Sequence, residues 1–145
     1  MNYRIMERPD ISKVVPLYMN YYNTQENGQW TEQTTFKRIH QVFSREDSYC
    51  LVLEENGEII AFAMGYFEQF DDCVTYDLVE IVVASHRQHQ GIGTKFMAEL
   101  EQRVKQKGAL LIQLLAVNDE FHLHFYGKLG YHDAGNLSLK GKLLS

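Results

Sequence analysis

The sequence predicts a single domain of the α/β (α+β) class over residues 1–145. Its length and its 45% hydrophobic content suit one domain with one core, and the chain is too short for two domains of ordinary size. Short apolar runs typical of strands alternate with amphipathic runs typical of helices. One apolar run, from Leu78 to Ala84, leads through a glycine-rich turn into an amphipathic run from Thr94 to Lys107.

The N-terminal part predicts one strand and two helices. A short strand from Tyr3 to Met6 is ended by Pro9, and Asp10 is expected to cap the helix that follows, because its side chain can accept from free N–H groups of the first turn. The apolar stripe of this helix consists of Ile11, Val14, Val15 and Tyr18. After a polar bend from Asn23 to Gln29, Thr31 is expected to cap a second helix. The residues expected to face inward from that helix are Phe36, Ile39, Val42 and Phe43.

The middle of the chain predicts a hairpin and a third strand. The runs from Tyr49 to Glu54 and from Ile59 to Phe70 are joined by a turn that contains Asn56 and Gly57, a pair that accepts the positive φ of a tight hairpin turn. After a second short turn, the run from Cys73 to Ala84 is expected to return as the central strand.

The C-terminal part predicts two more helices and two more strands. The helix after the glycine-rich turn ends at Gly108, which tolerates the left-handed geometry of a helix end. Its inward residues are Phe96, Met97, Leu100 and Val104. The run from Ala109 to Val117 is apolar almost throughout, which predicts a strand covered on both faces. A helix from Asp119 to Leu129 and a last strand from Leu137 to Leu143 complete the order β-α-α-β-β-β-α-β-α-β.

The glycine-rich turn reads Gln88-His89-Gln90-Gly91-Ile92-Gly93-Thr94. A turn that opens a helix presents free backbone N–H groups at the positive end of the helix dipole, where a pyrophosphate can be held. A dinucleotide-binding loop would need a further glycine where Phe96 stands, and a nucleoside-triphosphate loop would end in Gly-Lys-Ser/Thr, whereas Lys95 follows Thr94 here. The turn therefore predicts a nucleotide-bearing cofactor of another kind.

Two motifs together resemble the GNAT superfamily of N-acetyltransferases. The turn from Gln88 to Gly93 is similar to the family's cofactor loop, Gln/Arg-X-X-Gly-X-Gly/Ala, and the stretch from Phe125 to Tyr131 is similar to its Phe-Tyr-X-Lys-Leu-Gly-Phe/Tyr ending. The chain departs from the commoner pattern at Ser85, Gln88 and His89, where proline, arginine and glycine are frequent. The resemblance implies the GNAT fold, a central mixed, mostly antiparallel sheet of six to seven strands with splayed strands 4 and 5, flanked by four helices.

The resemblance implies that acetyl-coenzyme A binds between the splayed strands as co-substrate. Its pantetheine arm is expected beside the backbone of Ile81 and Val83, and its pyrophosphate in the loop from Gln88 to Thr94. A backbone N–H near Ile81 or Val82 is expected to stabilise the oxyanion formed when an amine attacks the thioester, and loss of one such donor typically costs about 3 kcal/mol.

Two residues near the C-terminus have roles that the resemblance implies. Asn118 is placed about where the family has an asparagine that touches the pantetheine arm. Tyr126 matches the family's tyrosine beside the coenzyme sulfur. A phenol has a reference pKa of about 10 and a thiol of about 8.5, so a hydrogen bond to the departing thiolate is a safer expectation than complete protonation.

The attacking amine must first lose a proton, because a lysine-like ammonium has a pKa of about 10.4. Asp77 and Glu80 on the central strand are the candidate proton acceptors. Their odd spacing places them on opposite faces of a regular strand unless a bulge intervenes. Asp77 is expected to share a face with Ile81 and Val83, and it stands at the distance from Gln88 where several family members carry a glutamate base. It is the preferred candidate, and ion pairing with a surface cation is the alternative role for either carboxylate.

The acceptor amine is expected to enter over the first two helices. Tyr22, Glu26 and Trp30 offer aromatic and acidic groups there that suit a cation. Tyr21 adds a further aromatic group to the same helices. Carboxylates at the far end of the hairpin, Glu68, Asp71 and Asp72, are further candidates for this acidic mouth. Scattered solvated carboxylates and core aromatics are an equal explanation of the same residues, so the pattern does not identify the acceptor.

These motifs lead to one main functional hypothesis and one alternative. The first is an N-acetyltransferase that passes acetyl from acetyl-coenzyme A to a primary amine by direct attack in a ternary complex. The acceptor is a polyamine, aminoglycoside or amino-acid derivative, or else a protein amine. Neither cysteine has a plausible base beside it, so no covalent acyl-enzyme is expected. The alternative is a non-catalytic sensor that binds acyl-coenzyme A without turnover.

Composition argues against several other classes. A net charge of −5 without a basic stripe argues against a nucleic-acid partner. No apolar run is long enough to span a membrane and no signal peptide is recognisable, so a cytoplasmic protein is expected. Cys50 and Cys73 are expected to be buried thiols, and the six histidines lack the spacing of a metal site. The resemblance also implies that a homodimer can form.

Overall fold

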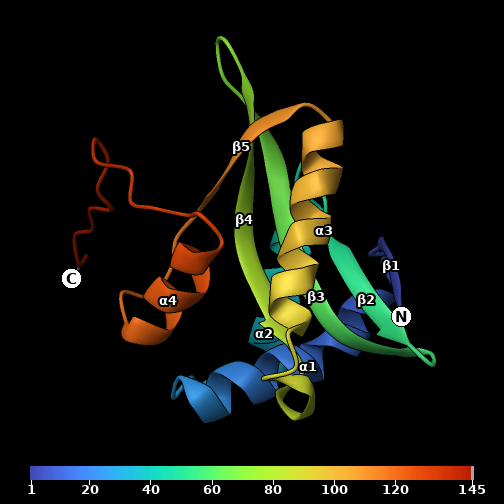
Figure 1. Ribbon diagram of the computed structural model, residues 1–145. Helices are drawn as coiled ribbons and strands as arrows, with labels where there is room; N and C mark the ends of the chain where they lie inside the picture. The colour runs from blue at the N-terminus through green and yellow to red at the C-terminus, as the bar shows by residue number, and fades with distance from the viewer. Residues whose placement is uncertain (145) are drawn as a thin grey trace. The chain divides into compact units, whose positions relative to one another are not determined.

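The structure is a computed structural model that describes residues 1–144. The chain divides into two compact units, Met1–Leu115 and the residues from Ala116 onward. The first contains β1 (Asn2–Ile5), α1 (Asp10–Gln25), α2 (Glu32–Phe43), β2 (Leu51–Glu55), β3 (Glu58–Gln69), β4 (Val74–Val83), the 3₁₀ turn η1 (Ser85–Arg87), α3 (Ile92–Gln106) and β5 (Ala109–Leu114) (Figure 1). The second contains α4 (Glu120–Lys128).

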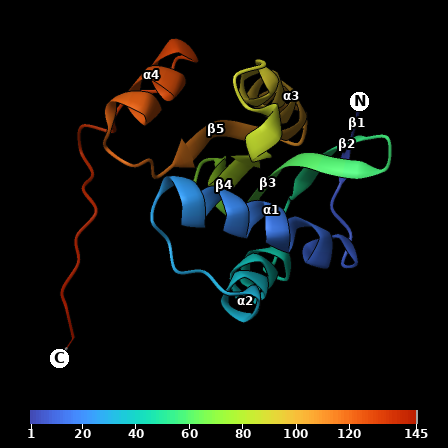
Figure 2. The same ribbon diagram turned by 90° about the horizontal axis from the view of Figure 1, so that it is seen from below.

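The first unit is built on a mixed sheet in the order β1-β2-β3-β4-β5. The first four strands pair antiparallel with their neighbours, and β5 runs parallel to β4. Helices α1 and α2 cover one face and α3 covers the other (Figure 2). The apolar stripes predicted for α1 and α3 are buried, namely Ile11, Val14, Val15 and Tyr18, and Phe96, Met97, Leu100 and Val104.

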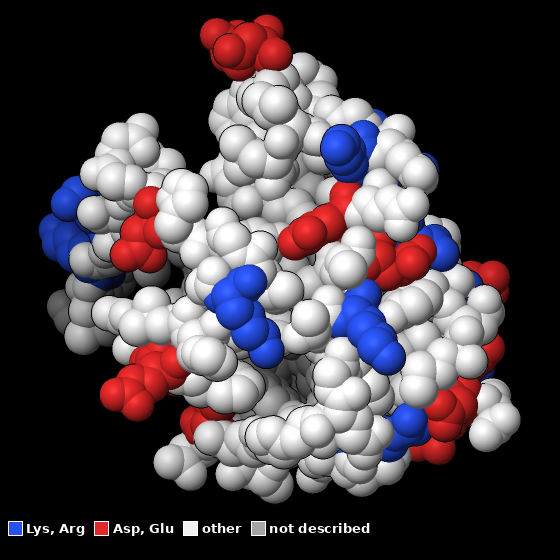
Figure 3. Space-filling model, in the orientation of Figure 1, with Lys and Arg blue, Asp and Glu red and all other residues white. Residues whose placement is uncertain are grey.

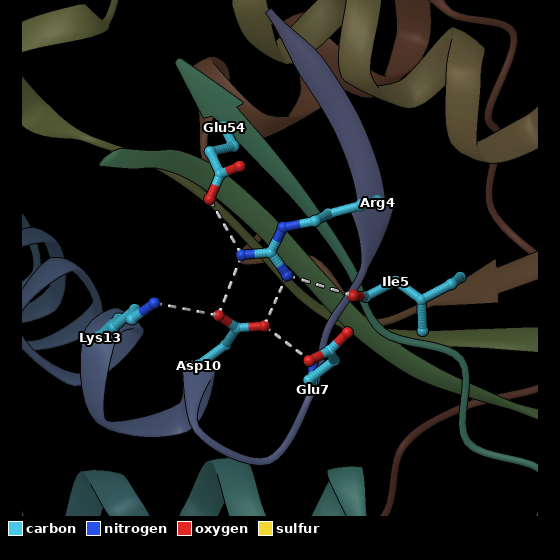
Figure 4. Close-up of polar contacts among 6 residues, drawn as sticks. All are labelled: Arg4, Ile5, Glu7, Asp10, Lys13 and Glu54. Atoms are coloured by element: carbon cyan, nitrogen blue, oxygen red, sulfur yellow. Dashed lines mark hydrogen bonds and ion pairs between the residues drawn. The ribbon is translucent and has the colours of Figure 1, made fainter. Parts of the chain in front are cut away.

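The beginning of α1 differs from the prediction in the role of Asp10. The helix begins at Asp10 itself, and Pro9 occupies the cap position without a side-chain hydrogen bond. The Asp10 carboxylate instead accepts from the Arg4 guanidinium at 2.7 and 3.0 Å and from the Glu7 N–H at 2.8 Å (Figure 4). Arg4 also bonds Glu54 at 3.0 Å, and this ties the helix start to the edge of the sheet. The ion pair with Arg4 of β1 therefore takes the place of the expected cap.

The caps and turns predicted for the next elements are confirmed. Thr31 caps α2 through a capping box with Thr34. At the β2–β3 turn, Asn56 has φ 52° and Gly57 has φ 80°, as the tight hairpin requires. The prediction that Phe36 faces inward is wrong, because Phe36 is 41% exposed, whereas Ile39 and Val42 are buried as predicted.

Over residues 1–144 the sheet has five strands, and the prediction of six to seven is wrong. Residues 137–143, expected as the last strand, have no regular secondary structure, and Leu137 and Leu139 are 67% and 82% exposed. A strand is stable only when a neighbour pairs with its backbone, and alternating leucines do not supply that neighbour. The run predicted to be covered on both faces forms the edge strand β5, where Leu110 and Leu111 are 72% and 46% exposed.

The cysteines, the lengths of the helices and the distribution of charged residues bear on the expectations from composition. Both cysteines are free, with Cys50 buried and Cys73 only half-buried. Within residues 1–144, no helix is long and apolar enough to cross a bilayer, and no three His, Cys, Asp or Glu side chains gather in a way that could hold a metal ion. On the face drawn in Figure 3, basic and acidic side chains are interspersed.

Candidate active site

The turn between β4 and α3 has the backbone geometry of an anion cradle. His89 has φ 63° and Gly91 has φ 79°, so the chain passes twice through the left-handed region before α3 begins at Ile92. His89 thus adopts a conformation that glycine adopts more easily, at a position where the commoner family pattern has glycine. The N–H of Lys95 makes the first helical bond, to the carbonyl oxygen of Gly91 at 3.1 Å.

The start of α3 carries no side-chain cap. Thr31 and Asp119 accept hydrogen bonds from the first turns of α2 and α4, but Gly91 has no side chain to do so, and the first turn of α3 contains no acidic residue. The leading N–H groups of a helix need a partner, and the helix dipole adds a partial positive charge there. The predicted loop residues, Gln88, His89, Gln90, Gly91, Ile92, Gly93 and Thr94, are therefore arranged so that their backbone can bind an anion.

The Gln88 side chain points away from that cradle. Its Nε2 donates to the carbonyl oxygen of Val83 at 3.2 Å, and its Oε1 accepts from Nε2 of Gln25 on α1 at 3.1 Å. Gln88 thus fastens the turn to the end of β4 and to α1. The backbone N–H groups, rather than this side chain, are left to contact a phosphate.

Beyond its middle, β4 is paired on one side only. The pairing between β4 and β5 runs from Val74–Ala109 to Leu78–Leu114, whereas β4 continues to Val83 (Figure 1). The N–H of Ala84 donates to Ile60 on the β3 side at 2.8 Å. Because strand N–H groups alternate in direction, the N–H groups of Ile81 and Val83 point to the side that β5 has left, whereas that of Val82 points to β3.

A β-bulge brings the two candidate carboxylates to the same face of the sheet. Glu80 pairs with Met64 and Asp77 pairs with Tyr66, two residues apart on β3, while Val79 is left without a partner in the register. Both side chains therefore face α1 and α2. The expectation that Asp77 shares a face with Ile81 is wrong, because the extra residue reverses the alternation between them.

Glu80 lies at the centre of a hydrogen-bonded cluster. Its carboxylate accepts from the hydroxyl of Tyr22 at 2.6 Å, from that of Tyr18 at 2.7 Å and from Nη2 of Arg38 at 3.3 Å. Burial, and after it the charge of Glu80, raise the pKa values of both tyrosines, so both hydroxyls remain protonated donors. Three donors hold this carboxylate in place, since hydrogen bonds to an ionised acceptor are stronger than neutral ones.

Asp77 has a different environment. Its Oδ2 is buried and accepts no hydrogen bond within the described residues. Burial, and after it the neighbouring carboxyl of Glu68, raise the pKa of Asp77 to about 6, whereas Tyr66 and Arg45 act in the opposite direction. The Arg45 guanidinium lies 3.7 Å from the centre of the Tyr66 ring. A half-buried carboxylate whose pKa lies close to neutrality can accept a proton and release it again.

The residues predicted for the acceptor end are only partly brought together. Tyr22 contacts Glu80 directly, and the Trp30 ring stands 5.1 Å from that of Tyr18, which in turn lies 4.6 Å from Tyr22. Glu26 follows at the C-terminal end of α1. Asp71 and Asp72 lie at the tip of the β3–β4 hairpin, at the opposite end of the sheet from α1 (Figure 1). Asp71 and Asp72 therefore do not join the predicted acidic mouth. The residues that do come together form a compact cluster of Tyr18, Tyr22, Trp30 and Glu80.

The second unit contains the remaining two predicted residues. Asn118 is exposed in the bend before α4, and the next residue, Asp119, caps the helix through the N–H of His122 at 2.8 Å. Tyr126 is half-buried on α4, with ring centres 5.0 Å from Phe125 and 5.8 Å from Tyr131.

Sequence reasoning missed two residues of this site. Tyr18 was assigned to the apolar stripe of the first helix, which its ring does join, but its hydroxyl is directed at Glu80. Arg38 was not singled out at all. Its only signal is that it precedes Ile39 in a helix whose inner positions are apolar, and the ion pair with Glu80 forms only once α2 is packed against α1 and β3.

Comparisons with known proteins identify the family and the fold. The acetyltransferase (GNAT) family model matches residues 14–131. An uncharacterised N-acetyltransferase of Bacillus subtilis strain 168, YhfO, is 27% identical over 119 residues, which cover 79% of this chain and 77% of its own. Among solved structures, a possible acetyltransferase from Clostridium difficile 630 matches with a TM-score of 0.83 at 12% identity, over 99% of this chain and 98% of the other.

A further solved structure of this fold contains the coenzyme. The aminoglycoside N-acetyltransferase AAC(6')-Iy, in complex with CoA, matches with a TM-score of 0.75 at 12% identity, over 97% of this chain and 93% of the other. At these identities the solved structures establish the fold alone. The residues that the family model matches make up most of the chain, and they include the turn between β4 and α3 and both carboxylates. The chain belongs to the acetyltransferase (GNAT) family.

Proposed function

We propose that the protein transfers an acetyl group from acetyl-coenzyme A to a primary amine, by direct attack within a ternary complex. One observation carries the proposal: a short segment, residues 84–91, joins the half of β4 that β5 leaves unpaired to the uncapped start of α3. An anion site and a row of free backbone groups therefore adjoin each other. A ligand with a pyrophosphate at one end and an amide-bearing arm at the other has the chemistry to use both.

The backbone of this chain supplies the proposed binding groups. The N–H groups from Gln88 to Thr94 would hold the pyrophosphate, and Ile81 and Val83 would pair with the arm as a neighbouring strand does. Acetyl-coenzyme A supplies the acyl group as an activated thioester. The N–H of Ile81, which points away from β3, is the proposed donor to the thioester carbonyl, and Val82 is the weaker candidate because its N–H is directed at β3.

Asp77 is the proposed proton acceptor. Its pKa of about 6 lets it stay ionised at neutral pH and still take a proton from an ammonium, directly or through water. Glu80 serves another purpose in this proposal. With three donors already on its two oxygens, it orients the aromatic groups around it and gives the acceptor end a fixed negative charge, which Arg38 partly balances.

The proposed acceptor is a small cationic amine. Tyr22 and Trp30 present ring faces that attract a cation, and Glu26 and Asp77 add negative charge on the same side of the sheet. AAC(6')-Iy, of the same fold, is by its name an aminoglycoside N-acetyltransferase. Tyr126 is the proposed donor to the departing thiolate, as its match to the family motif implies.

Release of free thiol from acetyl-coenzyme A tests the proposal. The purified chain is incubated with acetyl-coenzyme A and a panel of polyamines, aminoglycosides, amino acids and a peptide N-terminus, and coenzyme A binding is measured in parallel by calorimetry. Amine-dependent thiol release supports the transferase. Binding without release above background for every amine favours the non-catalytic sensor, and absence of binding contradicts both.

A further inference from the structure

Arg87 is the only arginine or lysine between β4 and α3, and its guanidinium is directed at Glu55 and Gln90. Its Nη1 lies 2.9 Å from Oε1 of Glu55 and its Nη2 lies 3.3 Å from Oε2, so the guanidinium grips the carboxylate with two hydrogen bonds. Its Nε donates to Oε1 of Gln90 at 3.2 Å. One side chain therefore connects the end of β2 with the middle of the turn that carries the proposed pyrophosphate site.

The turn needs such a connection because its backbone conformation is costly. His89 holds a left-handed conformation that non-glycine residues seldom adopt, and it persists only where the surroundings enforce it. The side-chain contacts of the turn to α1 are neutral and exposed, from Asn20 to Ser85 at 3.0 Å and from Gln25 to Gln88 at 3.1 Å, and the contact between His86 and Glu58, at 3.9 Å, joins two largely exposed side chains. The Arg87–Glu55 pair is bidentate and less exposed, with 20% and 30% of the two side chains accessible.

We propose that Glu55 and Arg87 are positioning residues, which hold the turn from Gln88 to Thr94 in the conformation that binds the coenzyme. The inference rests on the proposed function, because it assumes that this turn is the pyrophosphate site. In this proposal Arg87 holds the turn in place and does not contact the phosphates. Its charge is already balanced by Glu55, so it contributes nothing directly to the phosphates.

A competing role for Arg87 predicts the opposite change in coenzyme affinity, so the two roles can be distinguished. An arginine beside a pyrophosphate site can also be a direct phosphate ligand, and in that case Glu55 would be a competitor for its guanidinium. Removing the charge of Glu55 would then free Arg87 and tighten binding. If the pair positions the turn, the same substitution releases the turn and weakens binding.

The experiment is a calorimetric titration of the full chain with coenzyme A, together with steady-state kinetics. We expect Glu55→Gln to weaken binding about fivefold, which corresponds to the upper range for a partly exposed ion pair. Arg87→Gln should weaken it by a similar factor, and the double variant by no more than either single change, because both remove the same connection. Arg87→Lys keeps the charge but cannot span both partners, so it should also weaken binding.

Glu58→Gln is the matched control. Glu58 starts β3 across the same hairpin turn, lies 3.9 Å from His86 and is 67% exposed, so it should leave binding unchanged. For Glu55→Gln, the KM for acetyl-coenzyme A should rise while kcat and the acceptor KM remain as in the wild type. A merely destabilising change would lower the melting temperature without this selective effect on one KM.

Several results would overturn the inference. Tighter or unchanged binding by Glu55→Gln would do so, as would full binding by Arg87→Lys combined with loss in Arg87→Gln, which is the pattern of a direct phosphate contact. These outcomes leave the proposed transferase intact. If the wild type itself does not bind coenzyme A, the proposed function fails and the inference fails with it.

Discussion

Asp77 and Glu80 project from the same face of β4, because Val79 between them is left out of the pairing with β3. In a regular strand, residues at this odd spacing point to opposite faces. The bulge therefore places two carboxylates with different surroundings beside α1 and α2. Glu80 is held by three donors, whereas Asp77 keeps a buried oxygen without a hydrogen bond among the residues described.

Replacement of Asp77 by Asn tests its role as proton acceptor. We expect kcat/KM for the amine to fall about 10²- to 10³-fold, within the usual range for loss of a general base. In the wild type the rate should fall as pH drops below about 6, because the base is then protonated. Thiol release over pH 5 to 9 measures both. If Glu80→Gln abolishes this pH dependence and Asp77→Asn does not, the assignment is wrong.

The same substitution should stabilise the fold at neutral pH. The pKa of Asp77 in the folded protein, about 6, lies above the ordinary value of 3.8. Between these two pH values the folded state keeps a proton that the unfolded chain has already released, and above them the folded state must hold the carboxylate in its ionised form at a cost in stability. The favourable contribution of the retained proton is complete at low pH and is lost as pH rises through about 6. The melting temperature of Asp77→Asn should therefore exceed that of the wild type, by a margin that grows from pH 4 to pH 7. A constant margin would contradict the shifted pKa.

Tyr126→Phe removes one hydroxyl from α4. If that hydroxyl donates to the departing thiolate, kcat should fall by about tenfold or more while the affinity for coenzyme A stays within about twofold, because the hydrogen bond forms mainly in the transition state. Phe125→Leu, on the same helix, is the control for a packing defect. An unchanged kcat in Tyr126→Phe would remove the proposed role.

Gly91→Glu should abolish coenzyme binding. The new side chain has space, since nothing lies within 4 Å of a Cβ at this position, but it places a negative charge where the pyrophosphate is proposed to bind. The left-handed φ of 79° adds strain of about 1–2 kcal/mol. Gly108→Glu, with φ 103° and equal space at the other end of α3, controls for that strain and should bind normally. Calorimetric binding retained by Gly91→Glu would show that the loop is misassigned.

Gly65→Ala should destabilise the protein through the bulge. A Cβ at Gly65 would lie only 2.6 Å from Cζ of Tyr76, whose hydroxyl donates to the carbonyl oxygen of Tyr49 at 2.6 Å. Neither the buried ring nor the β4 backbone can move freely, so we expect a loss of about 1–3 kcal/mol in the free energy of unfolding. Urea denaturation measures it, with Gly135→Ala, which has open space, as the control. An unchanged stability would mean that the bulge tolerates a shift.

Local features of the fold could be predicted because neighbouring residues produce them. The Asn56–Gly57 turn, the Thr31 cap and the stop of α3 at Gly108 each depend on the conformational preferences of a few adjacent residues. The run from Leu137 to Leu143 shows the limit of such reasoning. Its alternation satisfies the pattern of a strand, but a strand also requires a partner, which no local pattern supplies.

The cluster at Glu80 could not be predicted for the same reason. Tyr18 and Tyr22 lie 62 and 58 positions away from Glu80 in the chain, and nothing in their local sequence distinguishes a core tyrosine from one that donates to a buried carboxylate. The position of Asp77 depends likewise on an unpaired residue in β4, which becomes apparent only when that strand is aligned with β3.

Local sequence patterns were sufficient to predict the family, the element order of the first unit and the turn from Gln88 to Thr94, because glycine spacing and short-range periodicity encode backbone conformation directly. The packed fold was needed to show that donors surround Glu80, that Asp77 keeps a buried oxygen without a hydrogen bond among the described residues, and that Arg87 pairs with Glu55. Those outcomes arise from strand register and helix packing, in which residues far apart in the chain set each other's solvation and partners.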